Sequence, residues 1–164
     1  MDNLDQHRAA ASRFRTQLGH DSKATQKMQP VSNTSGTEIL SVDADGAMDL
    51  RFTLDRQFGN FFGGVHGGII SALVDEACSY AAVAAVGVHC FLGTAELHAR
   101  IFGKAKVGVI DAKAKISQRS RYAVHADVEL FSEERKIAAG NAVLLIDLTR
   151  PINENWVVEP RRGE

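Results

Sequence analysis

The stretch GGIISALVDEACSYAAVAAVG, residues 67–87, is the longest apolar run in the chain and decides the architecture. Nothing in its interior breaks a helix, and it is just long enough to cross a membrane. Asp75 and Glu76 lie in its middle, however, and each charge at a bilayer centre costs about 2.5–3.5 kcal/mol. The stretch therefore predicts a central helix buried in a soluble protein that has no membrane partner.

The composition around this helix is that of an ordinary globular protein. The chain has 164 residues, of which 45% are hydrophobic and 24% are charged, and these values exclude disorder of the whole chain. Lys and Arg number 19, and Asp and Glu number 20, so the balance argues against a dedicated nucleic-acid binder. The first residues carry acids and lack the apolar core of a secretory signal, so we expect a cytoplasmic protein.

Strand patterns lie on both sides of the helix. Upstream, residues 39–42 are largely apolar, and residues 48–54 alternate with the period of a half-buried strand. Downstream, three alternating segments precede one that is apolar on nearly both faces, as in a central or interface strand: 92–102, 107–116, 121–131 and 137–148. Short linkers at 103–106, 117–120 and 132–135 favour antiparallel neighbours. The pattern predicts an α+β fold in which a curved antiparallel sheet wraps around one long helix.

An arm is expected at each end of this domain. Residues 1–35 combine a short helix over residues 3–18 with a polar linker over residues 19–35. Residues 36–149 form the predicted domain, and residues 150–164 form a frayed tail that contains two prolines.

The start of the long helix is the first candidate site. Four glycines, at positions 63, 64, 67 and 68, surround His66. Glycines at a helix N-terminus let a ligand approach free backbone N–H groups that carry partial positive charge. Such groups hold an anion, or stabilise an oxyanion that forms during acyl transfer. The structural alternative is a tight turn from strand to helix that needs glycine for its backbone angles.

Asp75 is the second candidate. It lies two turns into the helix on a stripe that has no large side chain: Gly68, Ser71, Cys78, Ser79 and Ala82. A carboxylate on such a stripe of a buried helix is costly unless it is paired or used in chemistry. Glu76 lies among larger side chains, so we favour Asp75 as the acid that faces a cleft. The alternative is a solvent-exposed side of the helix on which both acids are wet.

Metal and thiol chemistry find no support in the sequence. The six histidines and two cysteines show no metal-ligand spacing, and Cys78 and Cys90 form no C-x-x-C pair. No base is visible beside either cysteine, so neither is predicted to be a nucleophile. We expect two reduced thiols, no metal and no redox cofactor.

The segment NFFGGVHGGIISALVDEA, residues 60–77, resembles the signature of the hot-dog-fold acyl-CoA thioesterases of the PaaI-like type. That signature places an asparagine six residues before His-Gly-Gly and an acid nine residues after the histidine. Asn60, His66 and Asp75 match both spacings, and the strand order agrees over roughly residues 36–148. The resemblance implies a six-stranded hot-dog domain that hydrolyses an aryl- or short- to medium-chain acyl-CoA, with coenzyme A as part of the substrate.

The resemblance also implies catalytic roles. Gly67 would give the N–H that holds the oxyanion, and Asp75 would be the general base or the nucleophile. Asn60 would orient the attacking water or the thioester. His66 would shape the turn and help to position Asn60, and Thr94 would help to hold the water.

Further residues are expected to bind the substrate. Gly68 continues the glycine turn at the helix start, and the turn with Arg119 and Arg121 is similar to a basic turn near the nucleotide end of coenzyme A in the family. The acyl pocket is expected to be lined by phenylalanines whose alternative place is the core: Phe58, Phe61 and Phe62.

The spacing of the two main candidates has a geometric consequence. Eight residues at about 1.5 Å each put Asp75 about 12 Å beyond Gly67 along the helix axis. One bound carbonyl cannot touch both groups of the same helix, so, if both act, Asp75 comes from another subunit across a two-fold axis. This agrees with the family, whose active sites form between the subunits of a dimer. We expect a homodimer with shared sites, or a homotetramer.

Two other functions stay open. A hot-dog dehydratase or hydratase resembles the same fold, but it uses a histidine and an acid at a different spacing with Pro-rich surroundings, which this chain lacks. A non-catalytic acyl-CoA-binding protein would keep the glycines and would not need Asp75. Release of free thiol from a panel of acyl-CoA thioesters distinguishes these functions.

Overall fold

The computed structural model describes residues 30–43, 45–86, 91–147 and 149 of the chain. Its elements in chain order are α2 (Pro30–Ser35), β1 (Glu38–Val42), β2 (Met48–Thr53), the 3-10 turn η2 (Arg56–Phe58), α3 (Gly67–Val86), β3 (Phe91–Ile101), β4 (Val109–Arg119), β5 (Ala123–Ser132) and β6 (Arg135–Asp147). The helix expected over residues 3–18, the tail over residues 150–164 and Cys90 lie outside the described residues.

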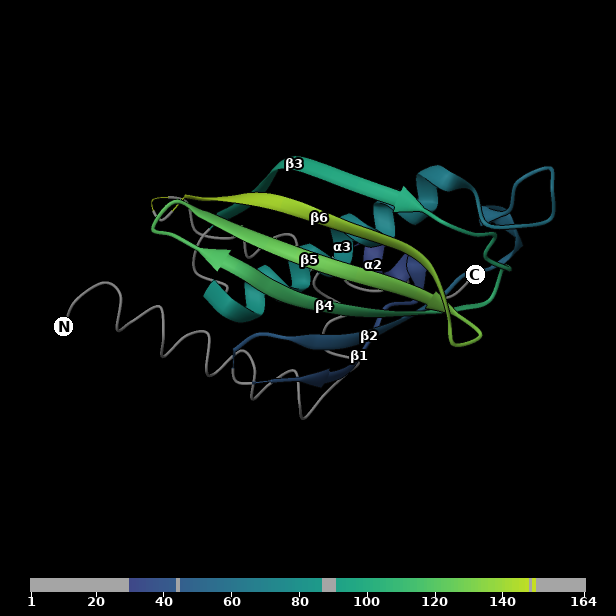
Figure 1. Ribbon diagram of the computed structural model, residues 1–164, viewed down its shortest axis with the longest axis horizontal. Helices are drawn as coiled ribbons and strands as arrows, with labels where there is room; N and C mark the ends of the chain where they lie inside the picture. Colours follow the sequence, from purple (N-terminus) through teal and green to yellow (C-terminus); the bar gives the residue numbers. More distant parts are fainter. Residues whose placement is uncertain (1–29, 44, 87–90, 148, 150–164) are drawn as a thin grey trace, which may run out of the picture.

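One curved sheet lies along α3, as Figure 1 shows. The strand order is β1-β2-β4-β5-β6-β3, and every pair of neighbouring strands is antiparallel. α3 packs against β2, β3, β4, β5 and β6. A six-stranded antiparallel sheet around one long helix is the hot-dog arrangement, so the predicted α+β fold class is confirmed.

The two faces of the sheet differ as the period of two predicts. Along β5, half-buried and buried residues alternate without exception. β6, which is apolar on nearly both faces, is a central strand between β5 and β3. The side chains between the sheet and α3 form one core whose largest fully buried members are Phe52, Leu50, Leu73, Ile110, Leu130, Ile137 and Leu144.

A glycine lets α3 approach the middle of the sheet. A Cβ at Gly140 on β6 would lie 2.5 Å from Val74 Cγ1 of α3, and closer still to the backbone oxygen of His98 on β3. Since these separations are below van der Waals contact, a side chain there would push the helix away from the sheet. Ala77 and Ala81, both fully buried on α3, suit the same close approach.

α3 is long and apolar enough to cross a membrane when length and composition alone are considered. In the folded protein most of its residues are buried inside the domain. The helix therefore behaves as the sequence predicts, as the central helix of a folded domain.

The linker expected over residues 19–35 is corrected at its end, because residues 30–35 form α2. Proline is well suited to the first position of a helix, where its missing N–H has no partner to lose. The hydroxyl of Ser32 lies 2.7 Å from the Tyr80 hydroxyl of α3, and both residues are buried. α2 is thus attached to the core helix and belongs to the folded domain.

Two turns also differ in detail from the expected linkers. β4 extends to Arg119, so the turn into β5 begins at Ser120. The hairpin between β5 and β6 closes through Glu133 and Glu134, whose φ angles are 51° and 63°. Two successive residues with positive φ match the twist of the flanking strands in a two-residue hairpin, which is why this turn is so short.

Candidate active site

One side chain organises the loop that leads into α3. Asn60 Nδ2 donates to the backbone oxygen of Val65 at 3.0 Å, and Asn60 Oδ1 accepts from the N–H groups of Phe62 at 2.9 Å and Gly64 at 3.2 Å. The backbone N–H of Asn60 also donates to the oxygen of Gly64 at 2.7 Å. The loop closes on itself, with Gly63 at a φ of 70°. Asn60 therefore builds the turn, and its contact with water or thioester stays a prediction.

His66 caps the first turn of α3. Its Nδ1 accepts from the backbone N–H of Gly68 at 3.0 Å, and its backbone oxygen accepts from Ile69 at 2.9 Å and Ile70 at 3.2 Å. Within the described part of the chain, the N–H of Gly67 is left as the group of this turn that has no acceptor. His66 shapes the turn, and no hydrogen bond joins its side chain to Asn60 among the described residues.

The free N–H of Gly67 belongs to the end of α3 that carries partial positive charge. Gly67 is part of the wall of an open pocket of about 890 Å³, whose other lining residues are Arg56, Gly59, Asn60, Phe61, Phe62, Gly63, His66 and Val107. A carbonyl oxygen in this pocket can accept a hydrogen bond from Gly67, and such an N–H stabilises the negative charge of an oxyanion. Arg56 and Val107 were not predicted as pocket residues from the sequence, because neither lies in a recognisable motif.

Phe61 and Phe62 stand at the rim of this pocket. Their exposed fractions are 105% and 84%, so the alternative that they belong to the core is wrong. Phe58, by contrast, is half-buried and packs against the core. The ammonium group of Lys104 donates to the backbone oxygen of Phe62 and ties the loop to the segment after β3. The rim is an exposed apolar surface of the kind that indicates a ligand-binding site or a protein interface.

Asp75 meets the edge strand β3. Thr94 Oγ1 donates to Asp75 Oδ1 at 2.8 Å, and an irregularity in the β3–β6 pairing lies between Thr94 and Glu96. Such irregularities re-aim side chains at the edges of sheets. Asp75 is half-buried, and no donor among the described residues binds its Oδ2. The fold thus brings Thr94 and Asp75 together and leaves one carboxylate oxygen available.

Glu76 occupies a different environment. Its Oε1 accepts from Thr37 Oγ1 at 2.6 Å and its Oε2 accepts from Ser35 Oγ at 3.0 Å, while the carboxylate residue is only 5% exposed. The alternative in which both acids are wet is therefore wrong for Glu76. The two hydroxyls come from positions about forty residues earlier, where nothing in the sequence distinguishes them from other polar residues.

Cys78 lies one turn beyond Asp75 and is fully buried. Burial, and after it the charge of Asp75, raises the pKa of the Cys78 thiol from its ordinary value of 9.0 to about 12. Its Sγ donates to the backbone oxygen of Ala126 at 3.6 Å. A thiol with this pKa is protonated at neutral pH and is a poor nucleophile. In the part of the chain that the structure describes, no three side chains of His, Cys, Asp and Glu could together hold a metal ion.

Gly67 and Asp75 do not share one site within a single chain. They are eight residues apart on α3, or about 12 Å along its axis, and the pocket at Gly67 does not include Asp75. Beside them, β3 is an edge strand whose Leu97 and Ile101 are 37% and 48% exposed. Ile101 Cδ1 lies 3.5 Å from the place that a Cβ on Gly67 would take, so this uncovered apolar side reaches the start of the helix.

The basic turn lies at the opposite end of α3. Arg119 Nη1 donates to the backbone oxygen of Ala85 at 2.8 Å, and the guanidinium of Arg121 lies 5.3 Å from the centre of the Tyr122 ring. Ala85 is 18 residues beyond Gly67, or about 27 Å along the helix. Within one chain, this turn and the glycine turn are therefore separate.

Comparisons with known proteins agree with this fold. Residues 62–139 match the model of the thioesterase superfamily. A thioesterase family protein from Silicibacter pomeroyi has a solved structure that is 26% identical, with a TM-score of 0.70, over 79% of this chain and 97% of that chain. A search of curated proteins finds no match to the sequence.

Two further solved structures come from proteins named for phenylacetic acid degradation. The E. coli PaaI protein of the phenylacetic acid degradation operon is 17% identical, with a TM-score of 0.70, over 81% of this chain and 95% of that chain. A phenylacetic acid degradation-related protein from Ralstonia eutropha is 23% identical, with a TM-score of 0.68, over 71% of this chain and 89% of that chain. The matched segment contains all of α3, β3, β4 and β5. Residues 62–139 thus match the thioesterase superfamily, and the chain has the hot-dog fold that these solved structures share.

Proposed function

We propose that this protein is an acyl-CoA thioesterase whose active sites are shared between two subunits. The observation that carries the proposal is the free N–H of Gly67 at the positive end of α3, on the wall of an open pocket with a phenylalanine rim. A thioester carbonyl in that pocket is polarised by this N–H and by the helix dipole. The match of residues 62–139 to the thioesterase superfamily supports the same chemistry.

Asp75 supplies the base in this proposal. Its free oxygen takes a proton from water as the water oxygen attacks the thioester carbon, and the negative charge moves to the carbonyl oxygen beside Gly67. When the intermediate collapses, the carbon–sulfur bond breaks and the proton passes from Asp75 to the departing thiolate. The products are the free acid and coenzyme A. Thr94, bonded to the other oxygen at 2.8 Å, holds the carboxylate in place.

A second route uses the same residues. The Asp75 carboxylate attacks the thioester directly, the thiolate leaves with a proton from solvent, and water then hydrolyses the mixed anhydride. In a single turnover in water labelled with heavy oxygen, label in Asp75 identifies the direct attack, because only an anhydride that water opens at the Asp75 carboxyl carbon leaves a water oxygen in the enzyme. Both routes need the Gly67 N–H and give the same products.

The second subunit is proposed to pair with the free edge of β3. An unpaired edge strand with exposed apolar residues is a site for pairing with another chain. Leu97 and Ile101 are such residues, and on the adjoining side of α3 the small residues Gly68 and Ala72 are exposed. Two α3 helices that run antiparallel across this edge bring Asp75 of one subunit to Gly67 of the other.

The same arrangement gives Arg119 and Arg121 a place in the site. Along an antiparallel partner helix, Ala85 lies ten residues beyond Asp75, or about 15 Å past Gly67 of the first subunit. A basic turn at that distance suits the nucleotide end of coenzyme A. The exposed rings of Phe61 and Phe62 favour an aryl or a short- to medium-chain acyl group at the pocket.

The direct test measures release of free thiol from a panel of aryl and short- to medium-chain acyl-CoA thioesters. We expect turnover of at least one of them, unchanged by a chelator, because the proposed chemistry needs no metal. Asp75→Asn protein is the matched control for contaminating activity. A folded protein that binds acyl-CoA tightly and releases no thiol would instead be a non-catalytic acyl-CoA-binding protein.

A further inference from the structure

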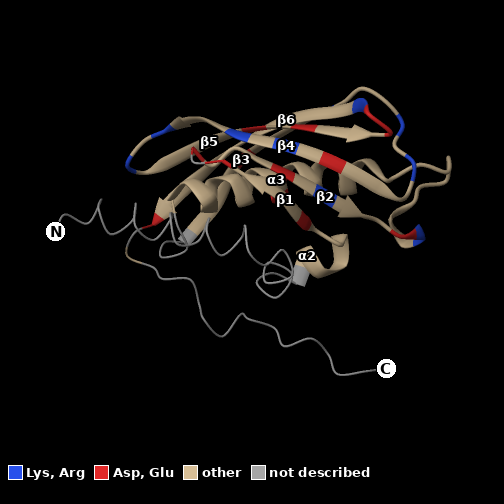
Figure 2. Ribbon diagram, turned by 90° about the horizontal axis from the view of Figure 1, so that it is seen from below, with Lys and Arg blue, Asp and Glu red and all other residues tan. Residues whose placement is uncertain are grey.

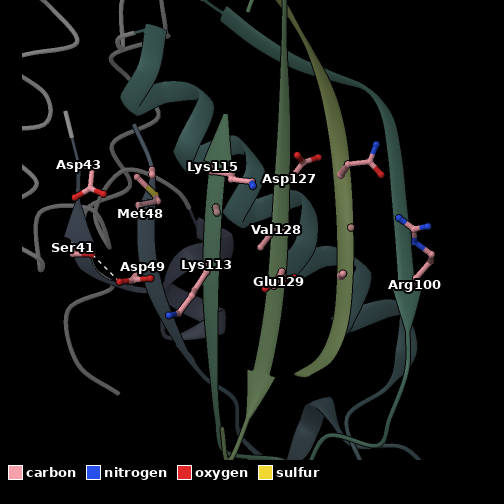
Figure 3. Close-up of a pocket in the computed structure, with 15 residues that line it drawn as sticks. Ser41, Asp43, Met48, Asp49, Arg100, Lys113, Lys115, Asp127, Val128 and Glu129 are labelled. Atoms are coloured by element: carbon pink, nitrogen blue, oxygen red, sulfur yellow. Dashed lines mark hydrogen bonds between the residues drawn. The ribbon is translucent and has the colours of Figure 1, made fainter. Parts of the chain in front are cut away.

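Two hollows of the described structure differ in the charges that line them. The first is a groove of about 530 Å³ on the face of the sheet that points away from α3, which Figure 3 shows. Four acids and three basic residues line it, and the register places Lys113 opposite Asp49 and Lys115 opposite Asp127. Figure 2 shows the same mixture of acidic and basic residues along the strands. The charges of the groove therefore nearly balance, so it offers little surplus charge to a bound ion.

The second hollow, the pocket of about 890 Å³ at Gly67, carries charge of one sign. Among the described residues that line it, Arg56 is the one Lys, Arg, Asp or Glu residue. The start of α3 adds partial positive charge to the same wall. Because no acid in this lining offsets these charges, the pocket is positive and suits an anionic group, unlike the groove on the sheet.

The guanidinium of Arg56 is free to bind such a group. Arg56 is exposed, and within the described part of the chain its side chain has no ion pair, hydrogen bond or ring contact. The adjacent acid is occupied elsewhere, since Asp55 Oδ1 accepts from the Gln57 N–H at 2.9 Å and Asp55 Oδ2 accepts from Gln57 Nε2 at 3.0 Å. Asp55 therefore caps the turn η2 and leaves the charge of Arg56 without a partner.

The turn that carries Arg56 is fastened to the start of α3. The Arg56 backbone oxygen accepts from the N–H of Gly59 at 3.1 Å, and the Phe58 backbone oxygen accepts from the N–H of His66 at 2.9 Å. Phe58 itself packs against the core. These contacts hold the base of the Arg56 side chain close to the residue that precedes Gly67. Because a positioned charge loses less freedom on binding than a mobile one, this anchoring favours recognition of a ligand.

The part of the substrate that meets Arg56 follows from the proposed site. That site has the reacting carbonyl at Gly67, and the nucleotide end of coenzyme A at the basic turn of the partner subunit, about 15 Å away. Arg56 instead shares its pocket with Phe61 and Phe62, which are proposed to contact the acyl group. An anion at Arg56 therefore belongs to the acyl group. A carboxylate is the fitting class, because two parallel N–H groups of a guanidinium match its two oxygens.

We propose that Arg56 is a specificity-determining residue that selects acyl groups with a carboxylate at their far end. The inference rests on the proposed function and deepens it: the substrates are coenzyme A thioesters of dicarboxylic acids, aromatic or of short to medium chain. In that site, Asp75 of the partner subunit puts a negative charge beside the reacting carbon. The guanidinium of Arg56 offsets the repulsion that this charge exerts on the acyl carboxylate. The products of hydrolysis are then a free dicarboxylic acid and coenzyme A.

Equilibrium binding tests the inference without the chemical step. The probes are two thioethers of coenzyme A that cannot be hydrolysed, 4-carboxyphenacyl-CoA and 4-carbamoylphenacyl-CoA, which match in shape and differ in charge. A second pair has the same two end groups on a short aliphatic chain. Titration calorimetry on the wild type should give a Kd about 5–10-fold lower for the acid than for the amide in at least one pair. This ratio lies between that of an exposed ion pair and that of a buried charged hydrogen bond.

Three variants assign the preference to Arg56. Arg56→Gln should remove it by weakening the binding of the acid alone, so that acid and amide bind alike. Arg56→Lys keeps the charge without the planar fork and should retain part of the preference. Lys113→Gln is the matched control, because it removes one positive charge from the groove on the sheet, and it should bind both probes as the wild type does. Circular dichroism verifies that every variant is folded.

No binding of any probe, equal binding of acid and amide in both pairs, or a preference that Arg56→Gln leaves unchanged would overturn the inference. Equal weakening of acid and amide by Arg56→Gln would place the guanidinium at a phosphate of coenzyme A and would overturn it as well. Thiol release from the corresponding thioesters separates the two proposals. A preference in binding that depends on Arg56, without turnover, would contradict the proposed function alone. Turnover of neutral thioesters without that preference would contradict this inference alone.

Discussion

Asp75 and Glu76 are neighbours on α3, and their side chains enter two different regions of the molecule. Asp75 is half-buried against the edge strand β3, where Thr94 binds one of its oxygens. Glu76 is 5% exposed, and the hydroxyls of Ser35 and Thr37 bind both of its oxygens. Successive residues leave a helix about 100° apart, so one acid points to the proposed interface and the other to the segment that joins α2 to β1.

Under the proposed function, the difference separates an acid that acts in chemistry from an acid that stabilises the fold. A carboxylate whose acceptors are filled by the protein's own donors anchors chain segments to one another, and its removal leaves those donors unsatisfied. A carboxylate with a free oxygen beside an open edge can take a proton from water. We therefore propose that Asp75 acts in thioester hydrolysis, whereas Glu76 attaches residues 35–37 to α3.

Asp75→Asn should have the largest effect on turnover. We expect kcat for the best acyl-CoA substrate to fall by about 10²–10⁴-fold, the scale of a positioned base or nucleophile. Glu76→Gln is the matched control on the neighbouring residue and should lower kcat far less. Steady-state kinetics on folded proteins decide the matter. Equal losses in the two variants would mean that Asp75 is not the catalytic acid.

Glu76→Ala should have the largest effect on stability. Loss of the carboxylate leaves the buried Ser35 and Thr37 hydroxyls without their acceptor, so the free energy of unfolding should fall by about 2–4 kcal/mol. Denaturant unfolding monitored by circular dichroism measures this value. Asp75→Ala, at a half-buried position with one hydroxyl partner, should cost less. A larger loss for Asp75→Ala would reverse the assignment of the two acids.

The buried thiol of Cys78 and the buried hydroxyl of Tyr80, both on α3, predict how the free energy of unfolding changes with pH. Burial raises the pKa of Cys78 from 9.0 to about 12 and the pKa of Tyr80 from 10.0 to about 12. Both groups lose their protons at a higher pH in the folded chain than in the unfolded chain. Their contribution is complete below about pH 9 and is lost as the pH rises to about 12, by about 1.4 kcal/mol per pH unit for each group.

Unfolding measured from pH 8 to pH 11 checks this prediction, with Cys78→Ala as the control. That variant should lose the part of the slope that begins near pH 9. Because the charge of Asp75 is one cause of the raised Cys78 pKa, Asp75→Asn should also lower the pKa of the thiol. A slope that Cys78→Ala leaves unchanged would contradict the burial of this thiol.

Thr94→Val should have the smallest effect on turnover. It removes the one hydroxyl that binds Asp75 and keeps the shape of the side chain, so kcat should fall by about 10-fold. Thr94→Ser restores a hydroxyl and should recover most of the activity. If the valine variant is fully active, Thr94 has no part in positioning the carboxylate.

The fold could be predicted because its signals are local and repeated. The helix expected over residues 67–87 is observed as Gly67–Val86, and all six expected strands occur in the sheet. α2 was not expected, because its six residues, PVSNTS, carry no hydrophobic period and are attached to α3 through hydroxyl contacts such as that of Ser32 with Tyr80. Periodicity reports which face of an element is buried, and it says nothing about contacts between distant segments.

The candidate site could be predicted in part. The family spacing matches Asn60, His66 and Asp75, and the resemblance implies roles for Gly67 and Thr94; the structure adds that Gly67 has a free N–H and that Thr94 contacts Asp75. The side chain of Asn60 forms hydrogen bonds within its own loop. The sequence could not predict these bonds, because each partner is a backbone group. The place of Arg119 at the far end of α3 depends on the length of the hairpin that carries it.

The most direct measurement mixes two inactive variants. Gly67→Pro removes the oxyanion N–H at a helix position where proline is tolerated, and Asp75→Asn removes the base. Subunit exchange of equal amounts makes half of the dimers mixed, and each mixed dimer has one site with an intact Gly67 and an intact Asp75. Activity should therefore return to about a quarter of the wild-type value. A site built within one chain predicts no recovery, so folded, verified mixed dimers that stay as inactive as their parents would contradict the shared site.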